Sequence, residues 1–188
     1  PVVRKAMRTG VPQRLLPLAF QLCAALLGWL GAGAPLLGGL RPLGLCFAAA
    51  VPTPYAVCAA AGAAAGYAFA LPLADAAPYL AGAAVVALLR GLAGTRRQNY
   101  APMAPATAAG IVFCLIRSGL AVAGYAGLPG ILSAAAEALL VLGLSYLLVG
   151  FFAVPRQGGM PQDAEERAAL CFAFMALLAC LTPYTVLG

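Results

Sequence analysis

Residues 43–71 read LGLCFAAAVPTPYAVCAAAGAAAGYAFAL, a stretch that contains no charged side chain. Pro52-Thr53-Pro54 interrupts it, and two prolines two residues apart break a helix. The stretch is therefore either one long helix or a tight helical hairpin, and the choice sets the sidedness of all that follows. Residues 43–52 are too short to cross a bilayer alone, so in a hairpin we expect them to be re-entrant or shielded by neighbouring helices.

Apolar runs of this kind fill nearly the whole chain of 188 residues. Hydrophobic residues make up 64% and charged residues 9%, and the mean hydropathy is +0.97, whereas about a quarter of a soluble domain is charged. We predict an all-α, polytopic transmembrane helix bundle of about seven spans, within a range of six to eight. The expected helices cover roughly residues 15–40, 43–52, 55–71, 78–94, 101–125, 130–154 and 167–187.

The basic residues decide between one helix and a hairpin. With a hairpin and a cytoplasmic N-terminus, nine of them lie on the inner side and only Arg41 on the outer side, while Arg117 lies within a span. A single helix would move Arg90, Arg96 and Arg97 outside, so the positive-inside rule favours the hairpin. The nine inner residues are Arg4, Lys5, Arg8, Arg14, Arg90, Arg96, Arg97, Arg156 and Arg167.

We expect two parts in the chain, a basic cytoplasmic segment over residues 1–14 and a multi-pass membrane domain over residues 15–188. The chain begins with Pro1 rather than methionine and ends within an apolar segment, so we interpret it as a truncated piece of a longer protein. The net charge is +6, but the basic residues lie at helix ends. There they set topology and contact the lipid bilayer, so no nucleic-acid partner is expected.

No motif in the chain indicates chemistry. The six cysteines lie in apolar runs without C-x-x-C spacing, and there is no histidine, so neither a metal site nor a disulfide framework is expected. A glycine-rich nucleotide loop, a nucleophile–base pair and a carboxylate dyad are also missing from the sequence. We therefore predict no catalytic, cofactor-binding or metal-binding residue in this segment.

Two ionisable residues lie well inside the predicted spans, on consecutive helices joined by a short loop. Arg117 is eight residues before Tyr125 and Glu137 is seven residues after Gly130, which puts both about 10–12 Å below the outer surface. Equal depth on antiparallel neighbours predicts an intramembrane ion pair. The pair either fixes helix register or forms a proton or ion site, and the lack of further polar residues favours the first. Asp75 is expected to be solvated in an outer loop.

Gly62 and Gly66 form a G-x-x-x-G motif in the alanine-rich helix over residues 59–70. Small residues at this spacing let two helix backbones approach closely. The motif indicates helix packing within the chain, and a dimer face is the alternative.

Several short motifs follow one another in a characteristic order. They are Arg41-Pro-Leu-Gly-Leu-Cys-Phe-Ala-Ala-Ala-Val51, the small-residue helix from Tyr55 to Gly66-Tyr67, Arg117 in the fifth helix, Glu137 near the start of the sixth, Phe-Phe-Ala-Val-Pro155 at its end, and the acidic Glu165-Glu166 before the next apolar helix. This order, over about residues 20–188, resembles the N-terminal membrane region of the stage II sporulation protein E family.

The resemblance implies a multi-pass protein of the cell membrane in endospore-forming bacteria, located with division proteins at the polar division septum. Family members continue into a serine/threonine phosphatase domain that activates the forespore sigma factor. Manganese or magnesium is expected only in that domain, which this chain does not contain, so no catalytic residue carries over. What the resemblance implies for this segment is anchoring, localisation and homo-oligomerisation.

The alternative function is a small-molecule transporter component, of the type of the substrate-binding membrane subunit of a vitamin-uptake system. Such a subunit needs convergent polar and aromatic side chains near one membrane face. The candidates are Asp75, Tyr79, Arg117, Tyr125 and Glu137. Another polytopic protein of unassigned role is the third interpretation.

Overall fold

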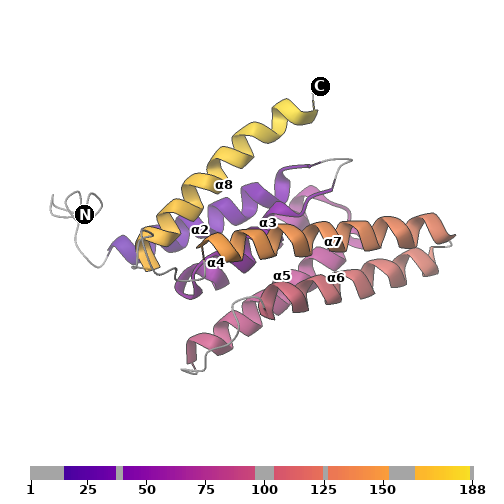
Figure 1. Ribbon diagram of the computed structural model, residues 1–188, viewed down its shortest axis with the longest axis horizontal. Helices are drawn as coiled ribbons and strands as arrows, with labels where there is room; N and C mark the ends of the chain where they lie inside the picture. The colour runs from indigo at the N-terminus through magenta and orange to yellow at the C-terminus, as the bar shows by residue number, and fades with distance from the viewer. Residues whose placement is uncertain (1–14, 37–39, 96–103, 125–126, 153–163, 187–188) are drawn as a thin grey trace.

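The computed structural model describes residues 15–36, 40–95, 104–124, 127–152 and 164–186 (Figure 1). Within these ranges the chain forms seven α-helices and no strand, which confirms the all-α class. The helices are α2 (Leu15–Gly33), α3 (Leu43–Ala50), α4 (Thr53–Ala70), α5 (Leu73–Thr95), α6 (Ala104–Ala123), α7 (Gly127–Phe152) and α8 (Ala164–Val186). The expected basic segment over residues 1–14 lies outside the described residues.

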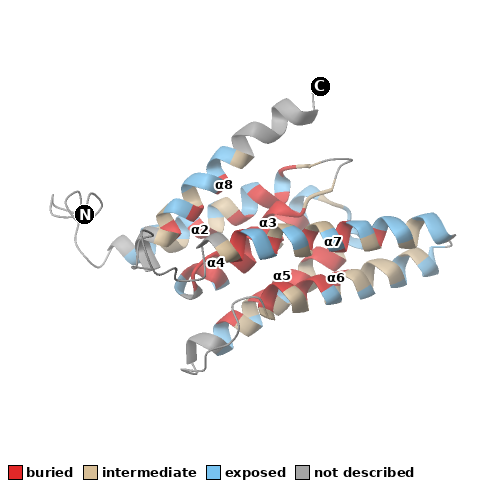
Figure 2. Cartoon of the chain, viewed as in Figure 1, coloured by how far each residue is buried: buried red, intermediate tan, exposed pale blue. Residues whose placement is uncertain are grey.

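Three of the described helices contain stretches long and apolar enough to cross a membrane, namely Leu73–Leu92, Ala104–Ala123 and Leu128–Gly150. Shorter apolar stretches are Pro17–Gly33, Pro54–Ala70 and Arg167–Leu178. Large apolar side chains are exposed on the outer faces of these helices, and Figure 2 marks the exposed positions in pale blue. Such faces are typical of helices that contact lipid, so the described part of the chain has the character of a membrane bundle.

The end of α2 differs from the prediction, because the helix stops at Gly33 rather than near residue 40. Glycine at position 33 and proline at position 35 both oppose continuation of the helix. Residues 34–36 and 40–42 are not helical. The described parts of the connection to α3 are therefore irregular.

The start of α5 also differs, because the helix begins at Leu73 and includes Pro78. The backbone N–H of Asp75 donates to the Pro72 carbonyl at 3.0 Å, which closes the first turn. Pro78 then removes only one intrahelical hydrogen bond. Asp75 therefore lies in the first turn of a helix, and its predicted place in a loop is wrong.

The short helix α3 lies at the centre of the bundle, and all of its residues from Leu43 to Ala50 are buried (Figure 2). It contacts α2, α4, α5, α6 and α7. At 1.5 Å per residue α3 is about 12 Å long, well short of a bilayer core of about 30 Å. α3 and α4 are separate helices with Val51 and Pro52 between them, and the neighbours shield α3, as the hairpin interpretation predicts.

A seam of small residues joins α2 to α4. A Cβ atom built on Gly62 would overlap the backbone of Ala25, and one built on Gly66 would come within 2.6 Å of the Trp29 carbonyl oxygen. Gly28 of α2 faces the α4 backbone in the same way. Only residues without a side chain allow two backbones to approach this closely. The G-x-x-x-G motif therefore lies at a contact between helices of one chain.

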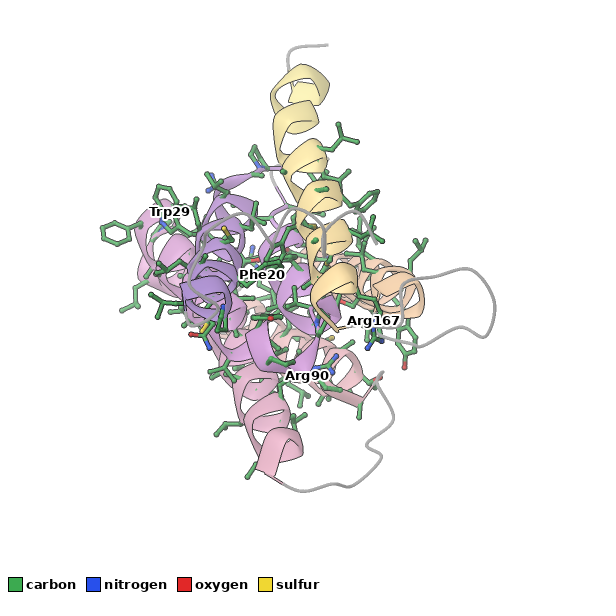
Figure 3. All side chains as sticks on the ribbon, turned by 90° about the vertical axis from the view of Figure 1, so that its left-hand side faces the viewer. Phe20, Trp29, Arg90 and Arg167 are labelled. Carbon is green, nitrogen blue, oxygen red and sulfur yellow. The ribbon has the colours of Figure 1, made fainter. Side chains whose placement is uncertain are left out.

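Aromatic side chains tie α8 to the other helices. The ring centroid of Phe172 lies 5.7 Å from that of Phe20, 6.0 Å from that of Phe47 and 6.3 Å from that of Tyr55. Figure 3 shows Phe20 between α2 and α8 in the interior, whereas Trp29 lies at the periphery. Beyond this cluster α8 diverges from the bundle (Figure 1).

Candidate functional site

Arg117 of α6 lies between two carboxylates from neighbouring helices. Its Nη1 is 2.7 Å from Oδ1 of Asp75 on α5, and its Nε is 3.9 Å from Oε2 of Glu137 on α7. The structure thus brings Arg117 and Glu137 together, but the closer partner of Arg117 is Asp75. The Glu137 side chain is 3% exposed, whereas those of Arg117 and Asp75 are 37% and 51% exposed. The three residues form a charged group that runs from the surface into the bundle.

Glu137 has a second partner, because it accepts a hydrogen bond from the hydroxyl of Tyr79 on α5. A buried carboxylate is costly unless donors and an opposite charge compensate it. Tyr79 supplies the donor and Arg117 the charge. Glu137 is therefore held by both of the helices that flank it in the network, α5 and α6.

Two stacked tyrosines connect this charged group to α3. The rings of Tyr67 and Tyr79 lie 4.4 Å apart between centroids at 19°. Tyr67 donates its hydroxyl hydrogen to the Arg41 carbonyl at 2.6 Å and accepts from the Leu45 N–H at 3.1 Å. The Arg41 N–H donates to the Tyr79 hydroxyl at 3.3 Å. The tyrosines thus satisfy backbone groups at the irregular entry to α3, groups that have no partner within the helix itself.

Arg90 of α5 holds the opposite end of α3. Its side chain is buried, and Nη2 donates to the Ala49 carbonyl at 2.5 Å. A cation at a helix C-terminus satisfies orphan carbonyls and complements the helix dipole. The positive-inside rule counted Arg90 among the basic residues of the inner side, but its side chain is buried within the bundle.

A notch opens beside the charged group, between the start of α5, the end of α6 and the start of α7. Its volume is about 300 Å³, and Asp75, Arg117 and Ser133 supply its polar wall. Leu120 and small residues of the three helices line the remainder. We refer to this cavity as the notch. It is the size of the smallest ligand pockets in proteins.

The sequence predictions find part of this site. Arg117 and Glu137 are recognisable from the sequence as charges at similar predicted depth, and Asp75 and Tyr79 were predicted as candidates near the outer face. The contacts of Asp75, Tyr67 and Tyr79 are revealed only by the fold. One signal was present for the tyrosines, because a tyrosine inside an apolar span needs a partner for its hydroxyl group. Tyr125 lies outside the described residues.

The described site offers a charged group for ion pairing and a cavity for a ligand. Within the described ranges, no group of three histidine, cysteine, aspartate or glutamate side chains could hold a metal ion. The charged group can hold a guanidinium between carboxylates, and the notch can admit a small polar molecule. Gly62 and Gly66 lie in the α2–α4 seam, away from the notch lining.

Comparison of the chain with protein-family models, with curated proteins and with solved structures found no match.

Proposed function

We propose that the chain is a membrane anchor and localisation region that resembles that of the sporulation phosphatases named above. The observation that carries the proposal is the interior of the described bundle, in which side chains pack against one another or form hydrogen bonds with neighbouring helices. The α2–α4 seam, the aromatic cluster and the buried helix α3 fill it with apolar contacts. Such an interior suits a rigid anchor, because a transport path needs a series of polar groups across the membrane.

The proposed topology has seven membrane elements and a cytoplasmic N-terminus. α3 is the embedded element that does not cross on its own: it runs inward from the outer side, and α4 returns outward, parallel to α2. The helices from α4 to α8 then alternate in direction. The support comes from the basic residues, since Arg96, Arg97 and Arg156 then share the inner side with the N-terminal segment. Reporter fusions within residues 96–103 and 153–163 are expected to report the cytoplasm, and a fusion at residue 125 the outside. The opposite pattern would refute this topology.

The anchor is proposed to form homo-oligomers and to contact division proteins through a surface other than the seam. The seam is already occupied within the chain, so its glycines are not free to meet a second copy. Exposed apolar residues of α2, such as Leu18, Leu22 and Leu26, recur every four residues and offer one such surface.

Localisation provides the direct test of the anchor function. A fluorescent protein fused before Pro1, on the proposed cytoplasmic side, is expressed with the chain in an endospore-forming bacterium that lacks its own anchor of this type. We expect a fluorescent band at the polar septum at the onset of sporulation. The control carries Gly143→Ala, which faces open space and leaves the fold intact. Even fluorescence over the whole envelope, with the protein folded, would refute septal localisation.

One observation favours the alternative function, a transporter component. The structure gathers Asp75, Tyr79, Arg117 and Glu137 at one end of the bundle beside the notch, as a substrate-binding subunit requires. The gene beyond the codon for Gly188 distinguishes the two functions. An in-frame phosphatase domain supports the anchor. A stop codon there, together with stabilisation of the purified chain by a vitamin, would replace the anchor by this second function.

A further inference from the structure

We propose that the notch binds the zwitterionic headgroup of an aminophospholipid of the phosphoethanolamine class. The lipid ammonium contacts the Asp75 carboxylate, and the lipid phosphate contacts the Arg117 guanidinium. This inference goes beyond the anchor function and holds for any role of the chain, but it rests on the chain lying in a bilayer.

The charges in the notch match a zwitterion better than an anion. The notch wall carries one carboxylate and one guanidinium, 2.7 Å apart, and the Glu137 carboxylate lies behind the guanidinium. Two carboxylates thus face one cation, so a purely anionic ligand meets net repulsion. In phosphoethanolamine the ammonium lies two carbons from the phosphate. Its positive end can therefore contact Asp75 while its negative end contacts Arg117.

The ion pair does not need to open when such a headgroup binds. The bond between the side chains uses Oδ1 of Asp75 and Nη1 of Arg117. A carboxylate has a second oxygen, and a guanidinium has five N–H donors in a fixed plane. The headgroup can therefore lie alongside the pair with its dipole antiparallel, and each charge gains a further hydrogen bond. The Ser133 hydroxyl group lines the same cavity and offers the phosphate another donor.

The surroundings of the notch favour a lipid over a soluble zwitterion. Leu120 lines the cavity, and Leu73 and Leu128 at the starts of α5 and α7 are 79% and 71% exposed. Half-exposed charges beside exposed leucines match the boundary between lipid headgroups and acyl chains. A headgroup in the notch would place its acyl chains against these leucines, and burial of that apolar surface adds to binding.

Native mass spectrometry of the purified chain tests the proposal. The chain is released from nanodiscs of equal parts phosphatidylethanolamine, phosphatidylcholine and phosphatidylglycerol, and the retained lipids are counted. We expect phosphatidylethanolamine to be retained about tenfold over either of the others, since one charge-assisted hydrogen bond changes affinity by about that factor. Equal retention of phosphatidylglycerol would overturn the proposal without any variant.

Variants locate the lipid in the notch. Asp75→Asn is expected to lower retention of phosphatidylethanolamine about tenfold, because the neutral amide loses the ammonium contact. Asp163→Asn removes the same charge elsewhere in the chain and is expected to change nothing. An undiminished preference in a folded Asp75→Asn chain would refute the site.

A competitor separates the lipid from a free zwitterion. Glycerophosphoethanolamine carries the same headgroup without acyl chains, and we expect it to displace the lipid only at far higher concentration. Displacement at equal concentration would show that the notch recognises a soluble zwitterion, which overturns the lipid as its occupant. Neither outcome depends on septal localisation, so a failure here is distinguishable from a failure of the anchor function.

Discussion

The substitution Gly62→Ala is expected to destabilise the membrane domain, although alanine is the better helix former. The new Cβ would overlap the Ala25 carbonyl oxygen on α2 and would lie 2.6 Å from the carbonyl carbon and 2.7 Å from Cα of the same residue. All three are backbone atoms, so no side-chain rotation can make room. The two helices must separate along the seam.

The magnitude follows from the overlap. The Ala25 Cα at 2.7 Å lies about 0.7 Å inside the 3.4 Å at which ordinary contact begins. Overpacking of a well-packed contact costs about 1–3 kcal/mol, with backbone clashes at the upper end, and the gain in helix propensity returns only about 0.5–1 kcal/mol. The net loss is about 2 kcal/mol, which lowers Tm by about 4–8 °C for a chain of this size.

Buried thiols provide the assay. Cys46 and Cys171 are fully buried, so a dye that fluoresces on reaction with thiols reports their exposure as the chain unfolds in detergent. Cys23 is exposed and contributes a constant background. The transition temperature is compared between the wild type and the variant under one lipid and detergent condition.

Gly143→Ala on α7 is the matched control, because a Cβ there meets no atom within 4 Å. It removes a helix glycine without a clash, so Tm should rise by about 2 °C. The reasoning is refuted if Gly62→Ala and Gly143→Ala shift Tm in the same direction by the same amount.

Three further variants test the polar contacts with the same dye assay. Glu137→Ala should destabilise the domain, and the addition of Arg117→Ala should cost little more; strictly additive losses in the double-mutant cycle would contradict the ion pair. Tyr67→Phe should cost about 1–3 kcal/mol, because it leaves buried backbone groups without partners. Tyr146→Phe removes the exposed hydrogen bond between Tyr146 and the Thr107 hydroxyl group and should cost less; equal losses would argue against the role of Tyr67. Arg90→Met should destabilise by a similar amount through the lost contact at the end of α3, and an unchanged Tm would show that this contact contributes nothing.

The fold was predictable wherever composition and local rules decide it. The all-helical class follows from the apolar runs, and the break between α3 and α4 follows from two prolines, which oppose a helix in any context. Local rules did not decide whether Pro78 lies inside a helix or before its start. A proline in the second turn of a helix removes a single bond, so its effect depends on whether the preceding residues close a first turn.

The site was predictable only as far as depth along the helices could be counted. Arg117 and Glu137 stand out because the hairpin between them is short and each lies seven or eight residues from its predicted helix end. Asp75 could not be assigned to Arg117, because that pairing depends on which face of α6 meets α5, and periodicity is weak in helices that are apolar on all sides. The same lack of periodicity hid the contact between Arg90 and α3.

The dependence of α3 on residues later in the chain has a consequence for biogenesis. When residues 43–50 leave the ribosome, the side chains that satisfy the two ends of the helix, those of Tyr67 and Arg90, have not yet emerged from it. A segment of this length with unpaired backbone ends cannot partition into the bilayer as an independent helix. We therefore expect the insertion machinery to retain α3 until α4 and α5 have emerged, so that the three helices enter the membrane as one cooperative unit.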